Sequence, residues 1–150
     1  MANASDFIDR TTRLIDRTAQ ALPRAAFAHW LLRLPLAAVL LQYGIDKFPL
    51  NPMAAEGFGV PFPLWILAAV GEIAVGLILI GSGFLRGNPG EVVTRVAGAA
   101  SAIIVAGVIV VAYWAPPLDL LMFNQFHILL LGASLYLALA GATPARDTAR

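Results

Sequence analysis

Residues 62–84 read FPLWILAAVGEIAVGLILIGSGF, an apolar run that contains one ionisable residue, Glu72. A helix needs about 20 apolar residues to cross a bilayer, and this run has that length. A membrane strand would instead alternate apolar and polar residues over about ten positions, and no such alternation is present. The stretch therefore predicts a transmembrane helix.

Three further runs of the same character occupy residues 29–46, 92–114 and 120–141. The whole chain is 59% hydrophobic and 13% charged, whereas soluble domains contain about 45–50% apolar and about 25% charged residues. We therefore expect an all-α integral membrane protein in which residues 28–142 form one bundle of four transmembrane helices.

The positions of the basic residues predict the orientation, because cytoplasmic loops carry an excess of Lys and Arg. These residues precede or open the first helix, bracket the link between the second and third helices, and recur in the tail: Arg10, Arg13, Arg17, Arg24, Arg33, Arg86, Arg95, Arg146 and Arg150. Lys47 alone falls on the other side. We expect a multi-pass protein of the bacterial cytoplasmic membrane, in contact with lipid, with both termini in the cytoplasm.

The segment before the first helix, residues 1–27, has a different pattern. Phe7, Leu14 and Leu22 recur at helical spacing with arginines between them. This pattern predicts an amphipathic helix at the cytoplasmic membrane surface, or a helix that docks on another subunit. Residues 143–150 are expected to form a loose tail.

The composition also excludes several classes of function. A net charge of +1 without a basic stripe offers no surface for nucleic acid. The absence of cysteine excludes disulfides, Cys-ligated zinc and iron–sulfur clusters. The two histidines, His29 and His127, are expected at opposite ends of the membrane, so they cannot hold one haem between them. We expect this chain to hold no haem, cluster or metal.

Glu72 is the first candidate catalytic residue, because an ionisable group inside a membrane helix costs at least about 2.5–3.5 kcal/mol. It lies near the middle of the second helix, on one face with Ala68 and Gly76. Either it exchanges a proton or contacts a quinone headgroup, or it is a protonated or paired carboxylate that fastens two helices.

His127 is the second candidate catalytic residue. Asn124, three residues earlier, shares its helical face, and Ser134 continues that face. A histidine at this depth can bond a quinone carbonyl and can change protonation near neutral pH. The alternative is a histidine that is satisfied by Asn124 or by a backbone group and that only holds helices together.

Candidate cofactor-binding residues gather around the end of the first helix. Gln42 and Asp46 are four residues apart, as are Tyr43 and Lys47. The expected topology brings these four residues and Asn124 into the outer half of the bundle, where they would line a polar funnel. The plainer interpretation of Asp46 and Lys47 is that they anchor a helix end at the membrane surface.

Residues 42–86 read QYGIDKFPLNPMAAEGFGVPFPLWILAAVGEIAVGLILIGSGFLR, and this stretch resembles the DoxX family of small four-helix membrane proteins. In that family the first helix ends in Gly-x-x-Lys, matched by Gly44 and Lys47. A Gly-hydrophobic-Pro turn follows, matched by residues 59–61, and then a glutamate, matched by Glu72. The last matches are a Gly-Leu pair at residues 76–77 and a glycine upstream of Arg86. The chain departs from the family in its longer amphipathic N-terminus.

The resemblance implies a membrane subunit of a quinone-linked oxidoreductase complex. Some family members are similar to the small membrane subunit of thiosulfate:quinone oxidoreductase, and others belong to membrane-associated oxidoreductase complexes. Quinone would then be the non-covalent cofactor, and another subunit of a redox or respiratory complex would carry the electron-transfer centre. Two alternatives stay open: a non-catalytic scaffold or assembly subunit, and a small-solute or metal transporter.

Overall fold

The computed structural model describes residues 28–85 and 87–141. The sequence-based expectations for residues 1–27 and 143–150 lie outside these residues. The described part is helical and contains no strand. Its helices are α2 (Ala28–Asp46), α3 (Pro52–Gly57), α4 (Phe62–Ser82), α5 (Asn88–Ala112), α6 (Pro117–Phe123) and α7 (Gln125–Ala140).

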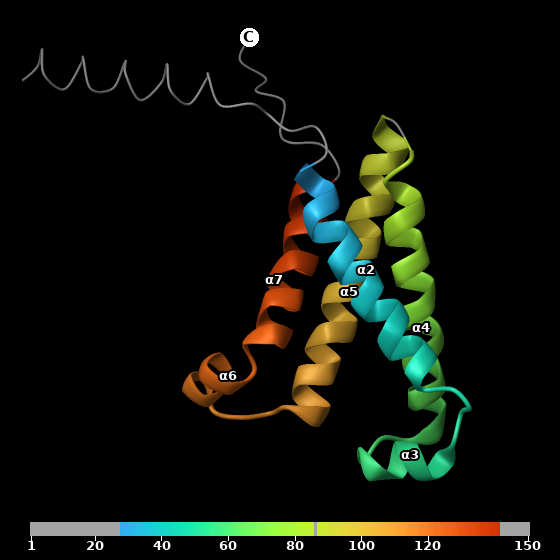
Figure 1. The fold of residues 1–150 in the computed structure, drawn as a ribbon, viewed down its shortest axis with the longest axis vertical. Coiled ribbons are helices and arrows are strands. Elements are labelled where there is room, and N and C mark those ends of the chain that lie inside the picture. Colours follow the sequence, from blue (N-terminus) through green and yellow to red (C-terminus); the bar gives the residue numbers. More distant parts are fainter. Residues whose placement is uncertain (1–27, 86, 142–150) are drawn as a thin grey trace, which may run out of the picture.

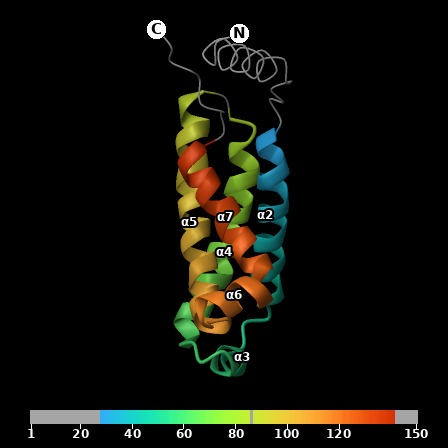
Figure 2. The same cartoon turned by 90° about the vertical axis from the view of Figure 1, so that its left-hand side faces the viewer.

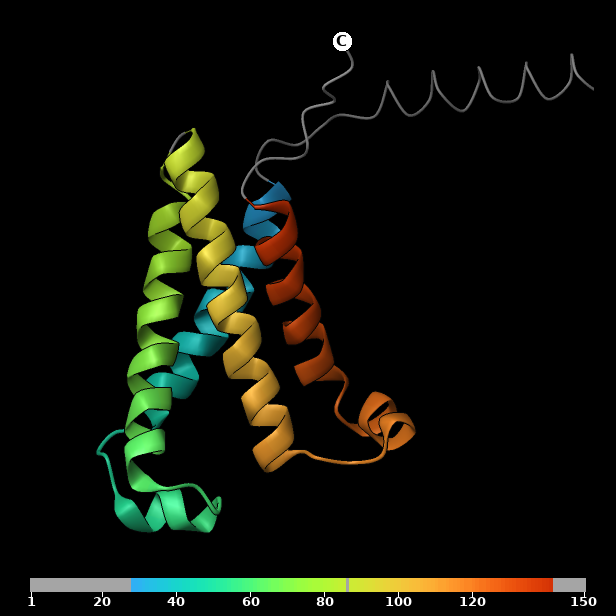
Figure 3. The same ribbon diagram turned by 180° about the vertical axis from the view of Figure 1, so that it is seen from behind.

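The longer helices α2, α4, α5 and α7 lie side by side, and the short helices α3 and α6 both lie at one end of the molecule (Figures 1 and 2). We call this the α3/α6 end. Helix α2 packs against α4, α4 against α5, and α5 against α7, whereas α2 and α7 touch over a shorter stretch. Figure 3 shows α7 leaning away from α4 toward the α3/α6 end.

Two of these helices, α4 and α5, are long and apolar enough to cross a membrane. Helices α6 and α7 meet the same criterion only if the bent pair is counted as one span. Helix α2, which contains Arg33 and Gln42 and ends at Asp46, is not among them.

The expectation of one continuous helix over residues 120–141 is wrong. The chain bends by 97° between α6 and α7, and the break falls at Asn124. A helix end leaves backbone carbonyls without partners, and here the side chain of Gln125 donates to the carbonyl oxygen of Met122 at 3.1 Å. The polar pair Asn124–Gln125 therefore ends one helix and begins the next.

Many large apolar side chains of the described residues face outward, although an apolar core lies between the helices. Ile103 and Leu139, for example, are 74% and 77% exposed. The interior holds a set of buried polar side chains: Arg33, Glu72, Ser82, Thr94, Ser101, His127 and Ser134. Extended exposed apolar surface marks a protein that contacts membrane or another protein, in agreement with the apolar character of α4 and α5.

Glycines at the helix contacts allow the backbones to approach closely. A Cβ atom built on Gly76 would lie 3.1 Å from the carbonyl oxygen of Ala37 in α2. A Cβ on Gly98 would lie 2.5 Å from the backbone nitrogen of Ala138 in α7. Small residues at such contacts are the usual packing device of membrane helices, so α2 with α4 and α5 with α7 form two closely packed pairs.

Candidate functional site

An ion pair joins the end of α2 to the middle of α4. Lys47 Nζ lies 2.6 Å from Glu72 Oε2, and the two side chains are 15% and 1% exposed. The same ammonium donates to the backbone carbonyl of Tyr43 at 3.1 Å and lies 5.3 Å from the ring centroid of Trp65. Charge-assisted hydrogen bonds of this kind are short and strong, so Lys47 fixes one oxygen of the Glu72 carboxylate.

The other carboxylate oxygen, Glu72 Oε1, is buried and has no hydrogen-bond partner. Buried polar atoms in native structures are almost always hydrogen-bonded, because removing them from water without a partner costs free energy. Glu72 therefore presents one satisfied oxygen toward Lys47 and one available acceptor inside the molecule.

His127 lies in the first turn of α7 and is 7% exposed. Its ring centroid is 4.0 Å from that of Tyr113, which follows the end of α5, and 5.5 Å from that of Phe126. His127 therefore packs against the residue that follows the end of α5. Its Nε2 atom is buried and has no hydrogen-bond partner.

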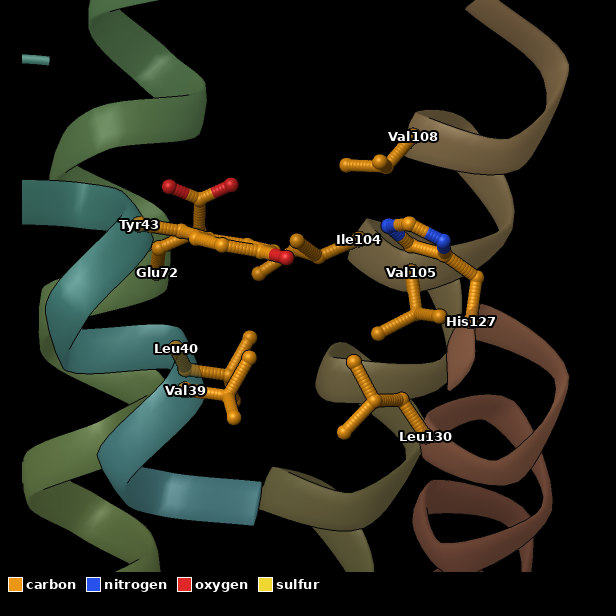
Figure 4. Close-up of a pocket in the computed structure, with 9 residues that line it drawn as sticks. All are labelled: Val39, Leu40, Tyr43, Glu72, Ile104, Val105, Val108, His127 and Leu130. Carbon is orange, nitrogen blue, oxygen red and sulfur yellow. The ribbon is translucent and has the colours of Figure 1, made fainter. Parts of the chain in front are cut away.

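Glu72 and His127 both contribute to the walls of one cavity at the centre of the four longer helices. Its walls are Val39, Leu40 and Tyr43 of α2, Glu72 of α4, Ile104, Val105 and Val108 of α5, and His127 and Leu130 of α7. Figure 4 shows the Tyr43 hydroxyl between the Glu72 carboxyl group and the His127 ring. The volume open to the centre of a water molecule is about 10 Å³, and the accessible lining is apolar.

The structure thus brings together three of the candidate site residues, Tyr43, Glu72 and His127. It also bonds Lys47 to two of them, to the side chain of Glu72 and to the backbone carbonyl of Tyr43. The remaining candidates lie elsewhere. Gln42 donates to Asp46 at 2.7 Å on the exposed side of α2. Asn124 forms the bend, where its backbone oxygen accepts from the backbone nitrogen of His127 at 3.1 Å. A role for these three in cofactor binding stays a prediction.

A second polar cluster surrounds Arg33, nearer the opposite end of the molecule. The guanidinium is fully buried; it donates to Thr94 Oγ1 at 2.9 Å and to Ser82 Oγ at 3.3 Å. The Trp30 ring covers it at 5.4 Å. In the described part of the chain no carboxylate pairs with Arg33, so neutral hydroxyls from α4 and α5 hold a cation that α2 supplies.

The sequence contains a signal for this cluster. Arg33 lies inside an apolar run, and the spacing of Arg33, Leu36 and Leu40 places them on one face of the helix. Those two leucines are buried. An arginine on the buried stripe of a helix must point into the protein, where it needs acceptors.

Among residues 28–85 and 87–141, no group of three or more His, Asp or Glu side chains is arranged to hold a metal ion. Comparison with known protein families, with curated proteins and with solved structures gives no match for this chain.

Proposed function

We propose that this chain is a small membrane subunit of a quinone-linked oxidoreductase complex. In this proposal α2, α4, α5 and the bent α6–α7 pair each cross the bacterial cytoplasmic membrane, and both termini are cytoplasmic. The apolar outer faces of the helices and the distribution of basic residues support this topology. Residues 1–27 would lie on the cytoplasmic surface and contact lipid or another subunit.

One observation carries the functional proposal: Glu72 Oε1 and His127 Nε2 are both buried without partners, and both residues line one cavity. Ionisable residues in the interior of a membrane protein commonly mark proton or substrate pathways. A carboxylate and an imidazole are the side chains most often used to move protons. The resemblance to the DoxX family supplies the expectation that the protons belong to quinone chemistry.

The size of the cavity selects between two versions of this proposal. A quinone supplies two-electron, two-proton chemistry at its ring oxygens when bound. The cavity, with a volume of about 10 Å³ and an apolar accessible lining, does not fit a quinone ring. We therefore assign Glu72 and His127 the exchange of protons, and we place the ring outside this cavity.

The electron-transfer centre would belong to a partner subunit. The chain has no cysteine for an iron–sulfur cluster, and its described residues include no metal-ligand cluster. The residues of this chain would then supply a membrane anchor and a proton site, while a redox protein bound to it would exchange the electrons.

Quinone-linked turnover of the purified complex tests the proposal. The tagged chain would be isolated in mild detergent, and co-purified proteins and lipids would be identified by mass spectrometry. We expect a redox protein and quinone, and we expect Glu72→Gln or His127→Phe to abolish turnover while the complex stays assembled. Full activity of both variants would exclude the proposal. Val110→Ile, which adds a methyl group to an exposed side chain of α5, serves as the control and should keep turnover unchanged.

The Lys47–Glu72 pair favours a second candidate, a non-catalytic scaffold or assembly subunit. The pair ties the end of α2 to α4, and a carboxylate with that single task would only fasten helices. In this case Glu72→Gln would lower the stability of the chain or its retention of partners without changing turnover per assembled complex. Measuring assembly and turnover on the same preparation separates the two candidates.

A further inference from the structure

We propose that α6 is a re-entrant segment that lies along the lipid leaflet at the α3/α6 end, where acyl chains cover its apolar side chains. The inference rests on the membrane topology proposed above and makes no use of the redox role. Four of the seven residues of α6 are large apolar residues that are 56–77% exposed: Leu118, Leu121, Met122 and Phe123. Among the described helices α6 contacts only α7, so these four side chains need a further partner.

The exposed side chains of α6 surround the helix instead of forming one stripe. At 3.6 residues per turn they spread over more than half of its circumference, and Asp119 is the only charged residue of α6. A helix that docks on a protein buries one apolar face, whereas a helix that is apolar on most sides lies in a protein core or in a membrane. No described helix other than α7 reaches α6, so the acyl chains of lipid are the partner that fits it.

The length of α7 places α6 at the depth of the acyl chains. Helix α7 has 16 residues, or about 24 Å at 1.5 Å per residue, whereas the hydrocarbon of a bilayer is about 30 Å thick. The bend of 97° turns α6 away from the direction of α7 (Figure 1), so α6 runs along the membrane where α7 begins. The exposed aromatic residues Tyr113 and Trp114 lead into α6, and such residues gather at the boundary between hydrocarbon and headgroups.

The backbone of α6 is suited to contact with lipid, because a polar backbone group without a partner is costly in hydrocarbon. The first residues of a helix leave N–H groups without partners, but Pro116 and Pro117 at the start of α6 have no N–H. At the other end of α6 the side chain of Gln125 donates to the carbonyl oxygen of Met122. The segment can therefore enter the leaflet with few unsatisfied backbone groups.

The helical spacing also predicts how α6 is rotated about its axis. Asp119 lies in the first turn of α6, and Leu121, two residues later, lies nearly on the opposite side of the helix. We expect Asp119 to face headgroups and water, and we expect Leu121 to face acyl chains. If a second copy of the chain covered α6 instead, Leu121 would be hidden from both water and lipid.

Electron paramagnetic resonance of spin-labelled cysteine variants tests this arrangement, because the chain has no native cysteine. The full chain would be reconstituted in phosphatidylcholine vesicles with one nitroxide label, at Leu121→Cys or at Asp119→Cys. Oxygen concentrates in hydrocarbon and a nickel chelate stays in water, so the ratio of their collision rates with the label reports its surroundings. We expect the ratio of oxygen to nickel collisions to be several-fold higher at Leu121→Cys than at Asp119→Cys.

Two exposed positions provide the references: Ile103→Cys on α5 gives the ratio for lipid, and Glu56→Cys on α3 gives the ratio for water. A Leu121→Cys ratio equal to that of Glu56→Cys would overturn the proposal, and so would a Leu121→Cys label that neither reagent reaches. Leu118→Cys replaces Leu121→Cys if that variant does not insert. Nickel access at Ile103→Cys would contradict the membrane topology of the proposed function. Nickel access at Leu121→Cys, with the lipid value at Ile103→Cys, would count against the α6 inference alone.

Discussion

Lys47 and Glu72 form an ion pair across the contact between α2 and α4, with Nζ 2.6 Å from Oε2. Lys47 also bonds the Tyr43 carbonyl of its own chain segment, so the pair continues the hydrogen-bonded end of α2. The carboxylate lies deeper than the ammonium, since Glu72 is 1% exposed and Lys47 15%. Among the described residues, Lys47 is thus the only hydrogen-bonding partner of the Glu72 carboxylate.

Removing Lys47 should therefore be more harmful than removing the whole pair. Lys47→Met leaves a buried carboxylate without a counter-charge, and we expect a loss of about 3 kcal/mol in the free energy of unfolding. The double variant Lys47→Met/Glu72→Gln should recover much of that loss, because no charge is then left buried. Unfolding in mild detergent, followed by circular dichroism, measures both.

The exposed pair Arg95–Glu91 on α5 supplies the matched control. It has the same N···O separation of 2.6 Å but lies on the surface, one helical turn apart. Exposed pairs contribute about 0–1 kcal/mol, so Arg95→Met should change stability little. An equal effect of Lys47→Met and Arg95→Met would contradict a structural role for the buried pair.

Two glycines of α5 should respond oppositely to the same substitution. Gly98→Ala places a methyl group 2.5 Å from a backbone nitrogen of α7, and we expect it to cost about 1–3 kcal/mol because the helices must separate. Gly107→Ala meets no atom within 4 Å and should stabilise the helix by about 0.5–1 kcal/mol. Thermal unfolding of both variants tests the α5–α7 contact, and equal effects would contradict it.

The longer helices α2, α4, α5 and α7 were predictable because their apolar runs are long, whereas the short helices α3 and α6 were not predicted. The break at Asn124 was not, since residues 120–141 are apolar enough to read as one span. What decides the bend is local: Pro117 starts a short helix, and Gln125 satisfies a carbonyl at its end. Such end interactions weigh little in a hydropathy pattern and become visible only in three dimensions.

The candidate site was predictable only in part, because the sequence does not show how each helix is rotated about its axis. The spacing in α2 links Tyr43 to Lys47, and hydropathy marks Glu72 and His127 as unusual. The rotation of each helix decides which of these side chains meet. The structure pairs Lys47 with Glu72 and turns Gln42 and Asp46 together to the exposed side, a distinction that depends on how α2 packs against α4.

Substitutions of the two residues that accept hydrogen bonds from Arg33 should lower the free energy of unfolding by different amounts. Thr94→Val removes the closer acceptor of a fully buried guanidinium and should cost about 1–3 kcal/mol, because a charged donor loses its partner. Ser82→Ala removes the longer, 3.3 Å bond and should cost less. Unfolding midpoints in detergent give the order.

The double variant Arg33→Met/Thr94→Val tests the reason for that order. Replacing a buried charge and its acceptor by apolar side chains of similar size is often neutral or stabilising, so we expect the double variant to be more stable than Thr94→Val alone. A double variant as unstable as the sum of the single changes would show that Arg33 contributes mainly by packing.

Cysteine labelling tests the proposed orientation of the two ends. The chain has no native cysteine, so each introduced thiol reports one position. Glu56→Cys on α3 and Asp119→Cys on α6 are exposed at the α3/α6 end, and Asn88→Cys is exposed at the opposite end. A membrane-impermeant maleimide should label the first two in intact spheroplasts and should label Asn88→Cys only after the membrane is opened.

The buried position Ser134 supplies the control, because Ser134→Cys lies inside the contact with Ser101 of α5 and should react only in denatured protein. Labelling of Asn88→Cys but not of Asp119→Cys in intact spheroplasts would reverse the orientation and turn the α3/α6 end toward the cytoplasm. Labelling from one side at both ends would contradict the spanning topology itself.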